Sequence, residues 1–184
     1  SGTLLGGWGD PATLIYPRSA CKMVQALPLA LSEPDLPAPR LALACASHMA
    51  ADIHTRGVTE WLTELGLGAD DLRCGPQDPR DREARDAMIR AGRPPSRIDN
   101  NCSGKHAGFL HLSRRLGAGP EYCDPAHPVQ TAIRETFDEL TGEQSPGHGI
   151  DGCSAPNFPC TVAGLARAAA RFATPGGGTG GAAM

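Results

Sequence analysis

The chain has 184 residues and is 40% hydrophobic, which is enough for one large domain or two small ones with a buried core. Its net charge of −3, with acidic and basic residues interspersed, excludes an electrostatic footprint for nucleic acid or an anionic membrane. The 23 glycines and 17 prolines predict many turns and short elements and exclude a long coiled coil. Small neutral or zwitterionic molecules are the expected partners.

The cysteines predict a reducing environment. There are seven, an odd number, and they lack the dense spacing of a disulfide-rich secreted protein. The sequence shows no signal peptide and no apolar run near the roughly 18 residues that a membrane span needs. We therefore expect a cytoplasmic protein whose thiols are buried, metal-bound or reactive.

The first predicted elements lead to a Ser-x-x-Lys motif. Thr3–Tyr16 is typical of two short strands around a turn at Gly6–Pro11. A helix is predicted to begin near Ser19, and three residues later Lys22 would place its amine on the same helical face as the hydroxyl. A neutral lysine there can take the serine proton. About one such match is expected by chance in a chain of this length, so a structural role stays open.

The apolar run Leu41–Ala46 predicts a buried strand. It would deliver Ser47 and His48 at its end, where a hydroxyl and an imidazole suit an active site. Polar residues follow many strands without any function, however. Both roles are open for this pair.

Amphipathic helices are predicted where apolar residues recur every three or four positions. The predicted helices are Thr55–Leu67, Asp81–Ala91, Lys105–Gly117, His127–Leu140 and Thr161–Phe172. A glycine-rich stretch then ends the chain and predicts disorder or a linker. The predicted organisation is a domain over residues 1–175 and a tail over residues 176–184.

Two stretches concentrate reactive groups. Asn100–His106 holds two amides, a thiol, a hydroxyl, an amine and an imidazole, and an apolar segment follows, which indicates a polar turn entering a helix. The alternative is an exposed loop whose side chains only cap that helix. Downstream, Gly149–Pro156 offers the carboxylate of Asp151 and the thiol of Cys153 in a turn framed by glycine and proline. Two such loops predict one site.

A metal is one interpretation of these loops. The usual zinc spacings are absent, because the sequence has no His-x-x-x-His or Cys-x-x-Cys pattern. Cys102 and Cys153 could still be two soft ligands, with Lys105 as a third if the metal displaces the proton on its amine. The alternative is a pair of buried, inert thiols.

Six motifs, taken in chain order, resemble those of the bacterial asparaginase II family related to the Rhizobium enzyme. They are Pro17–Lys22, Cys45–His48, Asp71–Pro76, Asn100–Phe109, His127–Gln130 and Gly149–Pro156. The resemblance implies hydrolysis of L-asparagine to aspartate and ammonia. It also implies an α/β (α+β) fold similar to serine β-lactamases and penicillin-binding proteins.

The resemblance also implies roles for individual residues. Ser19 would be the nucleophile, Lys22 its base and Ser47 the second serine of a tandem Ser-Lys arrangement. This agrees with what amide hydrolysis requires, a nucleophile, a neutral base and donors for the oxyanion. A zinc ion would be held near the substrate by Cys102, Lys105 and Cys153. Expected next to the substrate or behind these groups are Arg18, His48, Asn101, Ser103, Gly104, His106 and Asp151.

The sequence departs from the family in two places. Where the family continues Ser-Gly-Glu after the serine and histidine, this chain has Met49–Ala51, an apolar segment beside the predicted pocket. The family's lysine partner for Ser47 also falls beyond Met184. We therefore expect an N-terminal portion of the fold, incomplete at its C-terminus. An open sheet edge would then favour a homodimer or aggregation, or require a further segment.

Three functions follow from these patterns. The motifs favour an asparaginase-type amidohydrolase acting on L-asparagine. The expected truncation favours a catalytically incomplete relative that binds only a metal or ligand. A serine acyl hydrolase of the β-lactamase or peptidase kind shares the Ser-x-x-Lys motif, but it leaves the Cys-x-x-Lys and Asp-x-Cys loops unexplained.

Overall fold

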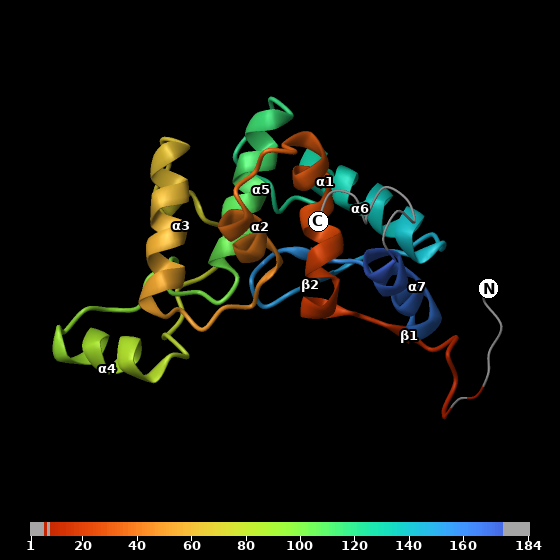
Figure 1. The fold of residues 1–184 in the computed structure, drawn as a ribbon, viewed down its shortest axis with the longest axis horizontal. Coiled ribbons are helices and arrows are strands. Elements are labelled where there is room, and N and C mark those ends of the chain that lie inside the picture. Colours follow the sequence, from red (N-terminus) through yellow and green to blue (C-terminus); the bar gives the residue numbers. More distant parts are fainter. Residues whose placement is uncertain (1–5, 7, 175–184) are drawn as a thin grey trace.

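In the computed structural model, helices make up most of the described chain, which comprises residue 6 and residues 8–174. Two short 3-10 helices, η1 (Arg18–Cys21) and η2 (Ala69–Asp71), precede α1 and follow α3. The α-helices, shown in Figure 1, are α1 (Lys22–Ser32), α2 (Ala38–Cys45), α3 (Asp52–Glu64), α4 (Arg82–Arg90), α5 (Ser103–Arg115), α6 (Pro128–Thr141) and α7 (Val162–Ala173). Within the described ranges, no helix is both long and apolar enough to span a membrane.

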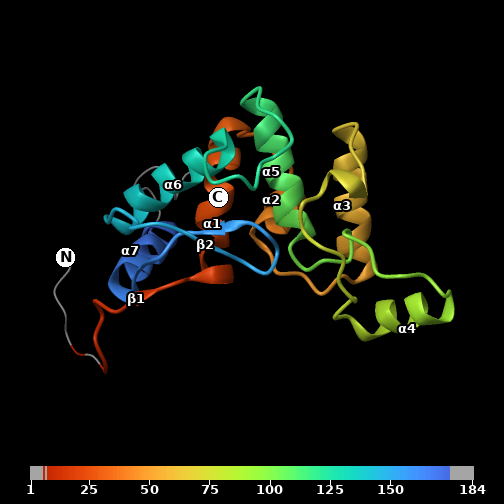
Figure 2. The same cartoon turned by 180° about the vertical axis from the view of Figure 1, so that it is seen from behind.

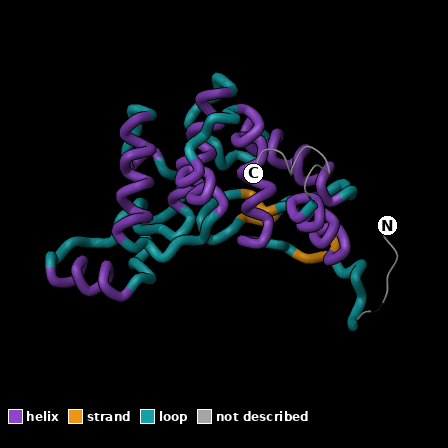
Figure 3. Tube along the Cα trace, viewed as in Figure 1, coloured by secondary structure: helices purple, strands orange, loops and turns teal. Residues whose placement is uncertain are grey.

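The strands are short and form two antiparallel pairs, drawn in orange in Figure 3. In the first, β1 (Leu14–Ile15) pairs with β4 (Cys160–Thr161). In the second, β2 (Gly149–Ile150) pairs with β3 (Pro156–Asn157) and forms a hairpin. The fold is therefore a mixture of helices and small sheets.

The core lies among the helices. α1 packs against α2, α5 and α6, while α2 also contacts α3 and α5, and α7 packs on α6. Figures 1 and 2 show these helices in a row, with α4 apart from them at one end. The bulkiest fully buried side chains include Trp61, Tyr122 and Phe137. The loops that connect the helices gather near the start of α5, and this is where the predicted site residues lie.

Two glycines let α5 approach its neighbours closely. A Cβ atom on Gly104 would lie 2.6 Å from the carbonyl oxygen of Leu43 in α2. A Cβ atom on Gly108 would lie 3.2 Å from the Cβ of Ala44. The first distance is too short for any side chain, so Gly104 allows the close contact between α2 and α5.

The predicted strand over Leu41–Ala46 is wrong, because Leu41–Cys45 belong to helix α2 and Ala46 is the residue that follows it. A short apolar run has no period that separates a strand from a buried helix. Pro39 in the first turn and the helix-forming Leu, Ala and Arg residues that follow favour the helix. Ser47 and His48 therefore follow a helix rather than a strand.

The remaining predicted helices agree with the structure, whereas the predicted hairpin does not. The five amphipathic helices are confirmed as α3 to α7, with ends that differ by a few residues. The predicted hairpin within Thr3–Tyr16 is wrong in its pairing, since β1 pairs with β4 and not with a preceding strand. Its first residues, like the predicted tail over residues 176–184, lie outside the described residues.

Candidate active site

A cavity of about 510 Å³ lies where the connecting loops meet. Five segments contribute to it: η1, the loop after α2, the loop before α4, the loop before α5, and the β2–β3 hairpin. Its lining residues are Arg18, Ser19, Ser47, Gln77, Arg80, Asn100, Asn101, Cys102, Asp151, Gly152 and Cys153. Seven of the thirteen predicted site residues are among them, so the structure brings the two reactive loops and the Ser-x-x-Lys motif to one place.

Ser19 is exposed on η1 and faces this cavity. The preceding residue, Arg18, has a φ of 51°, in the left-handed region that residues other than glycine rarely adopt. Its backbone N–H donates to Oδ1 of Asn157 at 3.2 Å, which helps to hold this conformation. Strain of this kind is often found at functional sites. The turn therefore presents the Ser19 hydroxyl to the cavity.

Lys22 lies in the first turn of α1 and is buried. Its Nζ donates to the carbonyl oxygen of Ala46 at 2.6 Å and to Oγ of Ser47 at 2.8 Å, and it lies 3.2 Å from Sγ of Cys102. Burial lowers the pKa of Lys22, although the neighbouring Cys102 opposes this shift. Among the described residues, Lys22 bonds to Ser47 and makes no hydrogen bond with Ser19.

The predicted metal ligands lie together at the wall of the cavity, which Cys102 and Cys153 line. Cys102, Lys105 and Cys153 are all buried, and Nζ of Lys105 lies 3.2 Å from Sγ of Cys153. Hydrogen bonding from Cys102 holds the pKa of the Cys153 thiol far below its ordinary value, and it raises that of Cys102. Burial lowers the pKa of Lys105, but Cys153 and Cys102 outweigh it and leave this pKa raised. Two thiols and one amine thus share this space, and Cys153 is the more acidic of the two thiols.

The same three side chains fit a soft divalent ion such as zinc. Within the described part of the chain, no three His, Cys, Asp or Glu side chains are arranged to hold a metal, so two cysteines need Lys105 as their third partner. Two buried sulfur atoms and a nitrogen suit zinc, and binding would displace the protons of Cys102 and Lys105. The donor set is compatible with the predicted ion.

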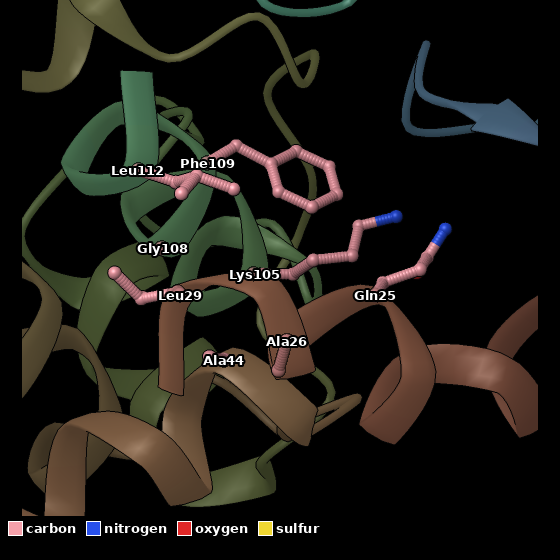
Figure 4. A pocket seen from close by; sticks show the side chains of 8 residues that line it. All are labelled: Gln25, Ala26, Leu29, Ala44, Lys105, Gly108, Phe109 and Leu112. Carbon is pink, nitrogen blue, oxygen red and sulfur yellow. The ribbon is translucent and has the colours of Figure 1, made fainter. Parts of the chain in front are cut away.

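Lys105 also borders a narrow crevice between α1, α2 and α5, shown in Figure 4. Its Nζ lies 5.4 Å from the ring centroid of Phe109, and the Gln25 side chain extends toward the same side. Gln25 is buried, and its Oε1 has no hydrogen-bond partner among the described residues. Gln25 was not predicted as a site residue, because only its place on the helix that carries Lys22 distinguishes it in the sequence.

Asp151 and Asn157 form the opposite ends of a polar bridge across the β2–β3 hairpin. Nδ2 of Asn157 donates to Oδ2 of Asp151 at 3.2 Å, and Nε of Arg18 lies 3.4 Å from Oδ1. Because Asn157 also accepts the backbone N–H of Arg18, one amide positions both the carboxylate and the turn before Ser19. Asn157 was not predicted, since nothing in its neighbourhood marks it as different from a turn residue.

His48 and Ser103 do not line the cavity but form a buried pair behind it. Nε2 of His48 lies 2.9 Å from Oγ of Ser103, whose hydroxyl donates to the carbonyl oxygen of Ile98. The His48 Nε2–H is therefore the donor, and Nδ1 accepts the N–H of Ala50. Burial lowers the pKa of His48 to about 4. This pair, like Gly104, supports the loops from behind.

His106 is also behind the cavity, next to the cysteines. The phenol oxygen of Tyr122 accepts the Arg73 N–H at 2.6 Å, so its own proton is available to Nδ1 of His106, 2.9 Å away. This leaves the His106 proton on Nε2, on the side of Cys153, and burial lowers the pKa of the ring to about 4. Tyr122 thus orients His106, a role that the sequence did not indicate.

Gln77 and Arg80 complete the lining from the loop before α4. Oε1 of Gln77 accepts the backbone N–H of Asn101 at 3.2 Å and so joins this loop to the one before α5. Neither residue was predicted as part of the site. The only signal of this loop was the dense Gly, Pro and charged composition after Arg73, which is common in plain surface turns.

Comparison with protein families matches the whole chain, residues 1–184, to L-asparaginase II. A comparison with curated proteins gives no match. The family match covers every segment that lines the cavity and agrees with the six motifs that first suggested it. The chain therefore belongs to the L-asparaginase II family.

Proposed function

We propose that this protein hydrolyses the side-chain amide of L-asparagine, with Ser19 as the nucleophile and Lys22 as the base. The observation that carries the proposal is the buried Lys22 amine, bonded to Ser47 beside a cavity that the exposed Ser19 also lines. An amine held by a hydroxyl, a carbonyl and a thiol is a suitable proton acceptor when neutral. The family suggests the substrate.

In the proposed reaction, Lys22 takes the proton of Ser19 as its Oγ attacks the amide carbon. The C–N bond then breaks, and the proton passes from Lys22 through Ser47 to the departing ammonia. This leaves an aspartyl ester on Ser19. Water next attacks the ester, with Lys22 accepting its proton and returning one to Ser19, so that aspartate is released and the enzyme is restored.

Zinc is part of the proposal, held by Cys102, Lys105 and Cys153. When bound, it would supply positive charge that polarises or orients the substrate. Asp151 lies beside this group and on the cavity wall, where its carboxylate can orient a bound amino acid. We also propose a β-lactamase-like architecture, supported by the mixed helices and small sheets and by the Ser-x-x-Lys motif at the start of α1.

Ammonia release from L-asparagine by the intact protein tests the function directly. We expect turnover of L-asparagine, loss of turnover after chelation, and trapping of an aspartyl ester on Ser19 by rapid acid quench and peptide mass spectrometry. A penicillin and a short peptide serve as alternative substrates. Binding of L-asparagine without turnover, or faster turnover of either alternative substrate, would overturn the assignment.

A further inference from the structure

Two arginines and one aspartate line the cavity: Arg18, Arg80 and Asp151. Arg18 is paired with Asp151 through the 3.4 Å contact of its Nε. Arg80, in contrast, makes no ion pair or hydrogen bond within the described ranges. Of these three groups, Arg80 is therefore the one without a partner of opposite charge, and the donors of its guanidinium group are all free.

The backbone that carries Arg80 is fixed, although it is neither helix nor strand. The N–H of the next residue, Asp81, donates to the carbonyl oxygen of Met49 at 2.8 Å. On the other side, Pro79 is buried, and Oε1 of Gln77 accepts the Asn101 N–H. These contacts attach the segment to two other cavity loops. Arg80 is thus presented at a defined place, and only its side chain is free to adjust.

We propose that Arg80 binds the α-carboxylate of the substrate and so restricts the enzyme to amides of free α-amino acids. The proposal rests on the proposed hydrolysis of L-asparagine. A guanidinium group can donate two parallel hydrogen bonds to a carboxylate, and it stays charged at every relevant pH. Because Asp151 already pairs with Arg18, Arg80 is the one of the two cavity arginines that gains more from an incoming anion.

This assignment accounts for the size and charge of the site together. A cavity of about 510 Å³ is large for one small amino acid, so walls alone would not fix its orientation. A carboxylate held at one point would place the side-chain amide reproducibly with respect to Ser19. Arg80 is therefore a specificity-determining residue that does not take part in the bond-breaking step.

The test compares two substrates in the intact protein. L-asparagine has the α-carboxylate, whereas L-asparaginamide has a neutral amide in its place, and chromatography distinguishes hydrolysis of the side-chain amide from that of the α-amide. In Arg80→Met we expect kcat/KM for L-asparagine to fall roughly 10- to 100-fold, mainly through KM, as for a lost charged hydrogen bond. For L-asparaginamide it should change less than about threefold. Arg80→Lys should recover part of the difference.

Arg90→Met is the matched control. Arg90 is also exposed and makes no ion pair or side-chain hydrogen bond in the described chain, but it lies on α4 outside the cavity. The Arg90→Met variant should have the parent's kcat/KM for both substrates. If the parent turns over L-asparagine and Arg80→Met keeps the parent's ratio between the two substrates, the Arg80 assignment is overturned while the proposed function stands.

Calorimetric binding of L-aspartate, the product, gives a readout that does not depend on turnover. We expect the parent and Arg90→Met to bind it and Arg80→Met to bind it roughly tenfold or more weakly. Equal binding by Arg80→Met would contradict the assignment. A parent that neither binds L-aspartate nor hydrolyses L-asparagine would overturn the proposed function, and the role of Arg80 with it.

Discussion

Two clusters of polar groups in this protein differ in whether all of their members have a hydrogen-bond or ion-pair partner. At the corner of α6, β4 and α7, Glu143 accepts the Thr161 N–H at 2.9 Å and its hydroxyl at 2.5 Å. Arg167 bonds to the same carboxylate and donates from Nε to the carbonyl oxygen of Thr141 at 2.6 Å. Each charged group of this Glu143 cluster has its partner within the cluster.

In the cluster of polar groups that lines the cavity, by contrast, some members have no partner. Lys22 is bonded to Ser47, but the hydroxyl of Ser19 and the guanidinium of Arg80 make no hydrogen bond within the described chain. A complete polar cluster contributes to stability, because its members replace the water lost on burial. A cluster with unpaired groups on a cavity can instead pair with a ligand. The predictions below test this distinction.

The largest effect is expected for Ser19→Ala. Removing the proposed nucleophile should lower turnover of L-asparagine by about 10³-fold or more, while thermal unfolding stays unchanged because Ser19 is exposed. Ser32→Ala is the control, since Ser32 lies at the end of α1 and its hydroxyl bonds only to the carbonyl oxygen of Leu29. Turnover within tenfold of the parent would remove Ser19 from the reaction.

The second prediction concerns metal content. Protein purified without chelator should contain about one zinc ion per chain, and Cys102→Ser/Cys153→Ser should lose it, because both sulfur ligands are removed. Elemental analysis is the measurement. Cys160→Ala is the control, since Cys160 belongs to β4 and lies near the Glu143 cluster. Zinc retained by the double variant would place the metal elsewhere.

The third prediction concerns how the free energy of unfolding depends on pH, through the buried His48 behind the cavity. Burial lowers the pKa of His48 from 6.5 to about 4, so the unfolded chain takes up a proton in this range before the folded protein does. The free energy of unfolding should thus fall by about 1–3 kcal/mol because of His48 as the pH is lowered from 6.5 to 4. Denaturant unfolding at several pH values measures it.

In His48→Gln this part of the pH dependence should disappear, even if the variant is less stable at pH 7. His148→Gln is the control, since His148 is exposed and makes no hydrogen bond within the described residues. An unchanged slope in His48→Gln would mean that other groups cause the acid sensitivity.

The smallest effect is expected at the complete cluster. Glu143→Gln should lower the free energy of unfolding by about 1 kcal/mol, because the amide weakens bonds to Thr161 and Arg167 at a partly exposed position. L-asparagine turnover should be unchanged. A large loss of activity with little loss of stability would show that the Glu143 cluster also acts on the site.

Periodic patterns in the sequence predicted the helices well. The spacing of Val58, Trp61, Leu62 and Leu65 predicted the helix that forms α3, and all four are buried. Such patterns are local and depend on one helical face. The run Leu41–Ala46 has no such period and was assigned wrongly. Besides the local signal of Pro39, the run packs against α5 around Gly104, about sixty positions away, and no local pattern indicates that contact.

Sequence also predicted which loops meet, but not how their side chains are paired. Unusual composition marked the loops of Cys102 and Cys153, and the structure brings them together at the cavity. The sequence did not indicate that Lys22 bonds to Ser47, nor that Asn157 and Arg80 belong to the site. Those relations arise from turns whose geometry is set by long-range contacts, and ordinary Asn and Arg residues in turns carry no distinguishing signal.

The bond between Arg18 and Asn157 joins residues 139 positions apart, and Lys22 and Cys102 are 80 apart. Loop closure over such distances slows folding, and it occurs after local helices have formed. During synthesis, the turn before Ser19 cannot take its final form until the β2–β3 hairpin has left the ribosome. Refolding should therefore recover helical circular dichroism before it recovers hydrolysis, and the delay between the two measures the time this last closure takes.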